Sequence, residues 1–269
     1  MSTTVLSDQT PTSSARPAAD QPAVPLARLV RAEGHKLTDT RSGFWLMLVM
    51  ALGGILATGA TAAGWHQVAR AAGASWTAGG SLVPFAPMML LPVLAILLVT
   101  SEWSTRSAMT TFTLEPRRGR VLLAKTVLML AVTVVVWLVC QGLTALSAAA
   151  GERIHPDYPA SWGIDRAAMA GDLGFTFLMV GMGLSLALLL GNAAAAIVVY
   201  MAQPLMTTTL GLIPGLRTPM EWASVNGMSL LSTGSLDGRD WAHVAVSATI
   251  WIVIPAAVGT VLSIRREIK

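Results

Sequence analysis

The sequence is poor in charged residues and in cysteine. Only 12% of its 269 residues are Asp, Glu, Lys or Arg, which is about half the share found in soluble domains. Several apolar runs have a length of about twenty residues, enough to cross the hydrocarbon of a bilayer, so membrane spans explain the composition better than a soluble core. The single cysteine, Cys140, excludes an intramolecular disulfide and a thiolate metal site, and its apolar surroundings indicate a packing residue.

Sequence motifs for catalysis are also missing. The four histidines lack the spacing of a metal site, and the serine-hydrolase string G-x-S-x-G does not occur. The stretch from Gly119 to Thr126 resembles a phosphate-binding loop, but Ala124 replaces the glycine that approaches the phosphates, and no strand precedes the stretch. We therefore expect that the chain is not an enzyme and holds no cofactor of its own.

The apolar runs predict an all-α integral membrane protein with six transmembrane helices. We place the spans at approximately 43–65, 82–101, 123–148, 169–190, 194–213 and 242–263. The fourth and fifth form one apolar tract that is too long for a single span. We divide it at Gly191-Asn192, a pair that is typical of turns.

The basic residues predict the orientation of these spans. With both termini in the cytoplasm, thirteen Lys and Arg residues lie on the inner side and five on the outer side. Five spans would put the basic C-terminus outside, so six fit better. We expect a multi-pass protein of the cell membrane. The formal charge of +4 is concentrated at span ends, which favours lipid headgroups over nucleic acid as the anionic partner.

The N-terminal part is predicted to have two segments before the transmembrane domain at 43–269. Residues 1–25 are polar and proline-containing, and they favour a disordered cytoplasmic tail. In residues 26–42 the apolar side chains share one helical face, which predicts an amphipathic interfacial helix. These apolar residues are Leu26, Leu29, Val30 and Leu37. Polar residues, among them Glu33, are expected on the remaining surface. An ordinary soluble helix or a flexible basic tether remains an alternative.

Few polar groups lie within the spans. Gln203, Thr207 and Thr208 in the fifth span could line a substrate path or hold helices together by hydrogen bonds. Prolines crowd the second span, where they could form a bendable gate or a fixed kink. No ionisable residue lies at the centre of a predicted span, which argues against an ion-coupled transporter.

The most polar internal stretch, Glu102–Lys125, joins the second and third spans and contains five of the eighteen basic residues. Glu102-Trp103 ends the second span, Thr110-Thr111-Phe112-Thr113-Leu114 follows, and Pro116-Arg117-Arg118-Gly119-Arg120 precedes Lys125 at the start of the third span. With the N-terminal RAEGHKLTDTRSGFW and the final WIVIPAAVGTVLSIRREIK, this order resembles the permease subunits of the type-2 ABC exporter family, particularly the small actinobacterial ones.

The resemblance implies a partner and a mechanism. Such a permease works with a separate cytoplasmic ABC ATPase subunit, which binds ATP and Mg²⁺, and with a second permease copy or a related permease. A coupling helix at about Ser104–Leu114 would dock on the ATPase. The residues implied in this coupling are Glu102, Trp103, Arg106, Met109, Thr110 and Phe112. Lipid headgroups or the partner would be contacted by Arg117, Arg118, Arg120 and Lys125.

The function expected from this resemblance is ATP-driven export of a hydrophobic or amphiphilic substrate. The main alternative is a membrane anchor or sensor that transports nothing and recruits a soluble partner through the same loop.

Overall fold

The computed structural model describes residues 25–104 and 118–266, so 1–24, 105–117 and 267–269 lie outside the described residues. Between these gaps the chain is helical apart from short connections, and its one β-bridge joins Ser75 to Ser161. The prediction of an all-α protein is confirmed for the described part of the chain.

Five of the described helical segments are long and apolar enough to cross a membrane. They are α2 (Arg41–Ala63), Gly119–Ile154 within α6 (Arg118–Ile154), α7 (Arg166–Leu190), α8 (Ala193–Leu210) and Gly238–Leu262. The last comprises α11 (Gly238–Ala248), the π-helical η4 (Thr249–Val253) and most of α12 (Ile254–Arg266). Helix α4 (Phe85–Ser104) has a shorter apolar stretch, Phe85–Ser101. These helices are compatible with a multi-pass membrane protein, while the count of six spans stays a prediction.

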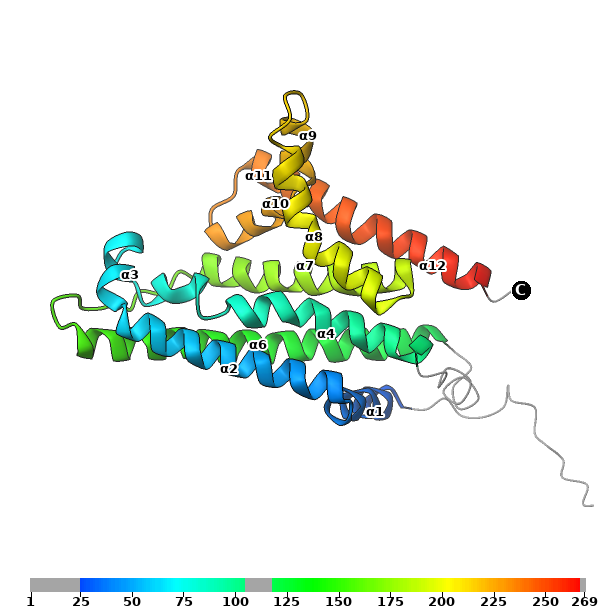
Figure 1. Cartoon of the computed structure of the whole chain (residues 1–269), viewed down its shortest axis with the longest axis horizontal. Coiled ribbons are helices and arrows are strands. Elements are labelled where there is room, and N and C mark those ends of the chain that lie inside the picture. Colours follow the sequence, from blue (N-terminus) through cyan, green and yellow to red (C-terminus); the bar gives the residue numbers. More distant parts are fainter. Residues whose placement is uncertain (1–24, 105–117, 267–269) are drawn as a thin grey trace, which may run out of the picture.

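The long helices form a bundle in which α2, α4, α6 and α7 run side by side, and α8 and α12 slope away from them (Figure 1). At one end of the bundle lies α1 (Leu26–Asp39), together with the end of α4, the start of α6 and the end of α12 (Figure 1). We call this the α1 end. The opposite end carries α3 (Trp65–Ala72) and η2 (Trp76–Ser81), and we call it the α3 end.

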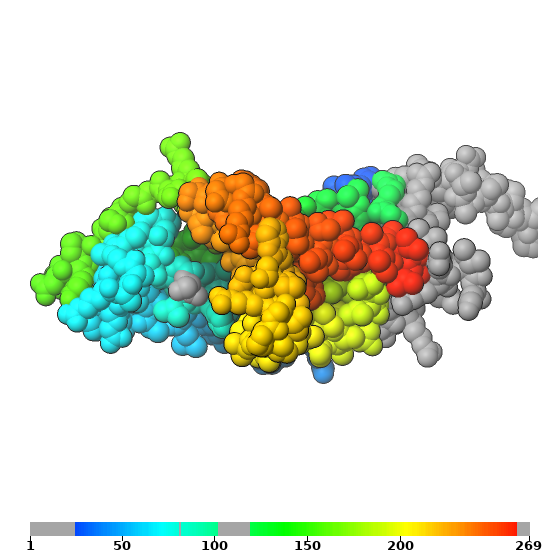
Figure 2. All heavy atoms as spheres, turned by 90° about the horizontal axis from the view of Figure 1, so that it is seen from above, coloured from blue at the N-terminus to red at the C-terminus, as the bar shows by residue number. Residues whose placement is uncertain are grey.

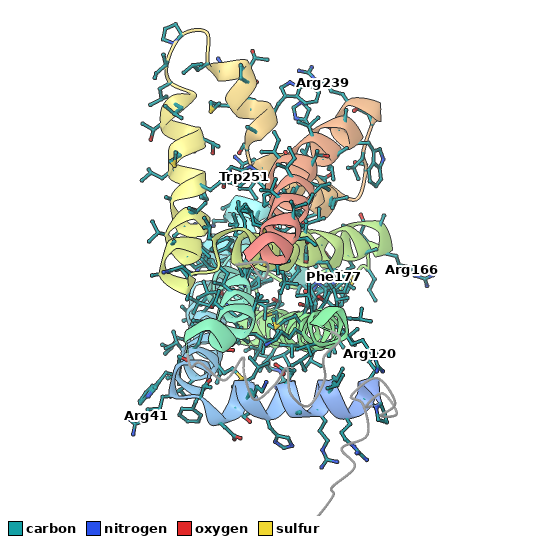
Figure 3. The ribbon with its side chains drawn as sticks, turned by 90° about the vertical axis from the view of Figure 1, so that its right-hand side faces the viewer. Arg41, Arg120, Arg166, Phe177, Arg239 and Trp251 are labelled. Atoms are coloured by element: carbon teal, nitrogen blue, oxygen red, sulfur yellow. The ribbon has the colours of Figure 1, made fainter. Side chains whose placement is uncertain are left out.

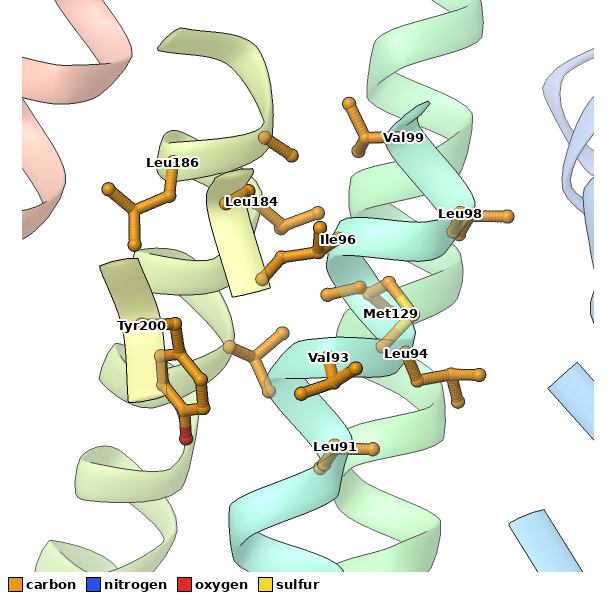
Figure 4. Close-up of a cluster of buried hydrophobic side chains, with 14 of the residues drawn as sticks. Leu91, Val93, Leu94, Ile96, Leu98, Val99, Met129, Leu184, Leu186 and Tyr200 are labelled. Carbon is orange, nitrogen blue, oxygen red and sulfur yellow. The ribbon is translucent and has the colours of Figure 1, made fainter. Parts of the chain in front are cut away.

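Helix α4 lies at the centre of the bundle. Almost every side chain from Leu91 to Thr100 is buried, as expected for a helix that is apolar on all sides. Its leucines, valines and isoleucine pack against three neighbouring helices (Figure 4). The labelled partners on those helices are Met129 of α6, Leu184 and Leu186 of α7, and Tyr200 of α8.

The turn between α7 and α8 lies where the sequence predicts it. Gly191 has a φ of 62°, in the left-handed region that favours glycine, and its N–H donates to the Ala187 carbonyl. Asn192 then caps α8, because its side-chain oxygen accepts a hydrogen bond of 3.1 Å from the Ala195 N–H. The division of the long apolar tract at Gly191-Asn192 is confirmed.

A proline explains the irregular segment in the last long helix. Pro255 has no N–H, so the Trp251 carbonyl four residues earlier cannot receive the usual helical hydrogen bond from it. The Ser185 hydroxyl of α7 lies 2.9 Å from that carbonyl and 2.9 Å from the Met182 carbonyl of its own helix, and its one hydrogen can be donated to either. The chain is π-helical from Thr249 to Val253. When Ser185 donates to the freed carbonyl, it joins the last helix to α7.

Candidate functional site

Most of the residues implied in ATPase coupling lie outside the described residues. These are Arg106, Met109, Thr110 and Phe112, together with Arg117 of the basic group. Glu102 and Trp103 belong to the last turn of α4, and Arg118 begins α6, each described by its backbone only. The connection from 105 to 117 therefore starts and finishes at the α1 end (Figure 1). Its role as a coupling helix stays a prediction.

Lys125 lies away from the surface where contact with headgroups or a partner was expected. Its exposed fraction is 2%, and its Nζ donates to Glu33 Oε2 at 2.9 Å and to the Leu98 carbonyl at 2.7 Å. Because Glu33 belongs to α1 and Leu98 to α4, this one ammonium group of α6 joins three helices. Arg120 is partly buried one turn earlier in α6.

Glu33 is the residue that the sequence reasoning placed on the wrong face of α1. It is 4% exposed, and it lies seven residues after Leu26 and four before Leu37, which puts it on the apolar face. This spacing is the signal that could have identified it. Helix α1 lies across the end of the bundle, roughly perpendicular to the long helices (Figure 3). Its apolar face, and Glu33 with it, is therefore covered by α4 and α6.

The three residues of the predicted substrate path do not meet in one cavity. Gln203 lines a cavity of about 200 Å³ with the methionines Met89, Met179, Met182 and Met201, and its side-chain amide makes no hydrogen bond among the described residues. Thr207 and Thr208 line a different cavity near α9 (Arg217–Ala223). Their hydroxyl groups donate to carbonyls one turn earlier in α8, at Gln203 and Pro204. Both hydroxyl groups thus have local partners.

A third cavity has a carboxylate in its wall. It measures about 320 Å³ and lies between α4, α6 and α7. Apolar residues of all three helices line it, namely Met88, Leu91, Val136 and Met169, and Trp137 and Asp172 face it from α6 and α7. We call it the Asp172 cavity. Figure 2 shows the surface hollowed between the cyan segment that contains η2 and the orange segment that follows α10 (Asn226–Ser229).

The rim of the Asp172 cavity is built by hydrogen bonds at the α3 end. The Trp76 indole donates to the Gly163 carbonyl at 2.9 Å, and Ser161 N–H donates to the Ala74 carbonyl at 2.7 Å. On the other side, η3 (Leu230–Thr233) passes so close to α7 that a Cβ at Gly171 would overlap the Leu231 carbonyl. The missing side chain at Gly171 is what allows Ser232 to lie beside Asp172.

Asp172 receives its hydrogen bonds from neutral groups. The Trp137 Nε1–H donates to Oδ2 at 2.8 Å, and the Gln141 amide lies 3.5 Å from the same oxygen. The Ser232 hydroxyl lies 3.5 Å from Oδ1. Among the described residues no Lys, Arg or His lines the cavity. A second carboxylate, Asp165, faces it from the start of α7, where it caps the helix.

Asp172 lies near one end of the predicted span 169–190, so it does not contradict the expectation that no ionisable residue lies at the centre of a span. Asp172 lies near the start of α7, but its carboxylate contacts Trp137, which lies next to the midpoint of α6 (Arg118–Ile154). Helices α6 and α7 are shifted along each other, so a carboxylate near the start of α7 lies beside the middle of α6. This shift cannot be read from the sequence of either helix alone.

Comparisons with protein-family models, curated proteins and solved structures found no significant match. The family resemblance therefore rests on the motifs of the sequence.

Proposed function

We propose that the chain is the membrane-spanning subunit of an ATP-driven exporter of the type-2 ABC kind. In this proposal a separate cytoplasmic ATPase supplies the energy, and a second copy of the chain or a related permease completes the transporter. The substrate is hydrophobic or amphiphilic. The motif order in Glu102–Lys125 favours this function over that of a passive anchor or sensor, and the long apolar helices are compatible with both.

The observation that carries the proposal is the Lys125 junction at the α1 end. The connection 105–117 follows α4 and precedes α6, and Lys125 joins these helices to α1 through Leu98 and Glu33. A partner that displaces the connection would therefore act on α4, α6 and α1 together. Binding of that partner can shift the permease between conformations only if it contacts them differently.

The same two helices reach the Asp172 cavity. Leu91 of α4 and Trp137 of α6 line the cavity, whereas Leu98 of α4 and Lys125 of α6 belong to the junction. A movement of α4 and α6 against α7 at the α1 end would consequently alter the walls of the cavity. Because α4 and α6 belong to both the Lys125 junction and the wall of the cavity, they would connect an ATPase at the α1 end with a substrate in the cavity.

The proposal is tested by purifying the tagged full-length chain from its native membrane in a mild nonionic detergent. We expect a second chain with a phosphate-binding loop to copurify and to hydrolyse ATP. Deletion of 104–114, or Glu102→Lys, should uncouple ATP hydrolysis from export while leaving membrane insertion intact. Asp157→Lys, an exposed change in the connection before α7, is the matched control. Recovery of a partner that cannot bind nucleotides, or full export by the deletion variant, would contradict the proposal.

A second candidate function follows from Asp172, because carboxylates within membrane bundles often carry protons or bind coupling ions. An ion-coupled transporter would take up solute into proteoliposomes when a proton or sodium gradient is applied without ATP. That uptake would be lost in Asp172→Asn. Uptake that requires both ATP and the copurified ATPase would instead favour the exporter.

A further inference from the structure

We propose that the Asp172 cavity binds a protonated organic amine that carries an apolar group, with the Asp172 carboxylate as its counter-ion. That this amine is the transported substrate rests on the function proposed above, whereas its binding to the cavity does not.

The cavity has a negatively charged lining. Asp172 is partly exposed, and both apolar and polar residues line the cavity. A carboxylate between packed helices is stabilised by a counter-ion. The described lining holds two carboxylates, Asp165 and Asp172, and no basic residue. Among the described residues Asp172 forms hydrogen bonds with neutral donors and no ion pair. A cationic ligand would offset this negative charge, and an anionic ligand would add to it.

The two carboxylate oxygens of Asp172 differ in the hydrogen bonds that they accept. Oδ2 accepts the well-formed bond from Trp137 and faces the Gln141 amide, whereas Oδ1 has only the long 3.5 Å contact with Ser232 among the described residues. An ionised carboxylate can accept about four hydrogen bonds, so Oδ1 retains acceptor capacity. This favours a ligand with an N–H donor, and therefore a protonated amine over a quaternary ammonium.

The size and lining of the cavity limit which amines can bind. A volume of about 320 Å³ is at the small end for ligand sites. Met88, Leu91 and Met169 offer flexible apolar contact to a ring or short chain. Trp137 lines the cavity as well, and an indole beside a carboxylate is a favourable neighbour for a cation. A small amphiphile with one positive end matches both the volume and the lining.

The experiment measures the equilibrium binding of three probes to the full-length chain in a nonionic detergent at pH 7. The probes are 2-(1-naphthyl)ethylamine, which is protonated at this pH as a lysine side chain is, the neutral 2-(1-naphthyl)ethanol, and the anionic 1-naphthylacetate. We expect the amine to bind about 10- to 100-fold more tightly than the alcohol, the range of a hydrogen bond to a charged group. The acetate should bind more weakly than either.

Variants then locate the site. Asp172→Asn keeps the size of the side chain and removes the charge, so the preference for the amine should fall to about threefold or less, while the affinity for the alcohol changes little. Asp157→Asn removes an exposed carboxylate that does not line the cavity, and the preference should persist. The probe comparison on the unmodified chain decides the proposal even where a variant does not fold.

The proposal is overturned if the unmodified chain binds the amine no better than the alcohol, or if Asp172→Asn retains the full preference. Because this assay needs no ATPase, its failure leaves the exporter proposal standing. Conversely, if no ATPase copurifies but the chain binds the amine through Asp172, the exporter proposal is refuted and the proposal of an amine site in the Asp172 cavity is supported.

Discussion

Two carboxylates inside the bundle, Glu33 and Asp172, have opposite surroundings. Glu33 binds two ammonium groups, with Lys36 Nζ 2.6 Å from Oε1 and Lys125 Nζ 2.9 Å from Oε2. Asp172 binds the neutral groups of Trp137, Gln141 and Ser232 beside a cavity. A buried charge that its own chain neutralises can hold helices in place. A charge that the described chain leaves without a counter-ion is available to a ligand.

The largest effect is expected when the Glu33 pairing is broken. Glu33→Leu removes the carboxylate that lies 2.9 Å from the buried Lys125 Nζ, and the loss of one partner from a buried ion pair costs about 3–5 kcal/mol. The measurement is the free energy of unfolding in mixed micelles. The attachment of α1 to α4 and α6 should weaken as well, because the Glu33–Lys125 contact adds to the apolar packing of Leu37 against the bundle.

The double variant Glu33→Leu with Lys125→Met is the control for this experiment. Apolar residues of similar volume often replace a buried ion pair with little loss of stability, because the cost of removing both charges from water disappears. We expect the double variant to be closer to the unmodified chain than Glu33→Leu is. A double variant as unstable as the single one would show that Glu33 stabilises the junction by packing rather than by charge.

The second prediction gives Asp172 a partner like that of Glu33. Met169 lies three residues before Asp172 on α7 and lines the same cavity, so Met169→Lys places an ammonium group on the same helical face. That group competes for Oδ1, and the affinity for 2-(1-naphthyl)ethylamine should fall by about tenfold or more. Equilibrium binding of the three probes measures the change.

Met169→Leu is the matched variant for this prediction, because it changes the shape at the same position without adding charge. It should lower the affinities for the amine and the alcohol by similar, small factors. If Met169→Leu lowers the affinity for the amine as much as Met169→Lys does, then the shape of the cavity, rather than an ion pair with Asp172, governs binding.

The sequence predicted features that depend on local patterns. The all-helical class and the turn at Gly191-Asn192 follow from apolar length and from two residues with strong turn preferences. The surroundings of the two carboxylates depend instead on how helices pack. Glu33 and Lys125 are 92 residues apart, and the depth of Asp172 depends on the stagger of α7 against α6. The periodicity of one helix shows neither which residues pair between helices nor how far two helices are shifted along each other.

Gln203 illustrates the same limit. Its place within an apolar run marked it as unusual, together with Thr207 and Thr208. A shared substrate path was one interpretation of these three residues, and hydrogen bonding between helices was the other. Different neighbouring segments cover different parts of α8. Gln203 therefore lines a methionine-rich cavity, whereas Thr207 and Thr208 line another cavity. Which neighbour covers which part of a helix is a property of the fold.

The smallest effect is expected at Lys36, the second partner of Glu33. The Lys36 side chain is 40% exposed, compared with 3% for Lys125, and water and salt weaken ion pairs of exposed groups to about 0–1 kcal/mol. In Lys36→Met the buried charges of Glu33 and Lys125 still neutralise each other, so the free energy of unfolding should fall by no more than this amount. Raising the salt concentration should reduce the difference between the two chains further. A loss comparable to that of Glu33→Leu would mean that Lys36, and not Lys125, is the counter-ion that holds Glu33 at the end of the bundle.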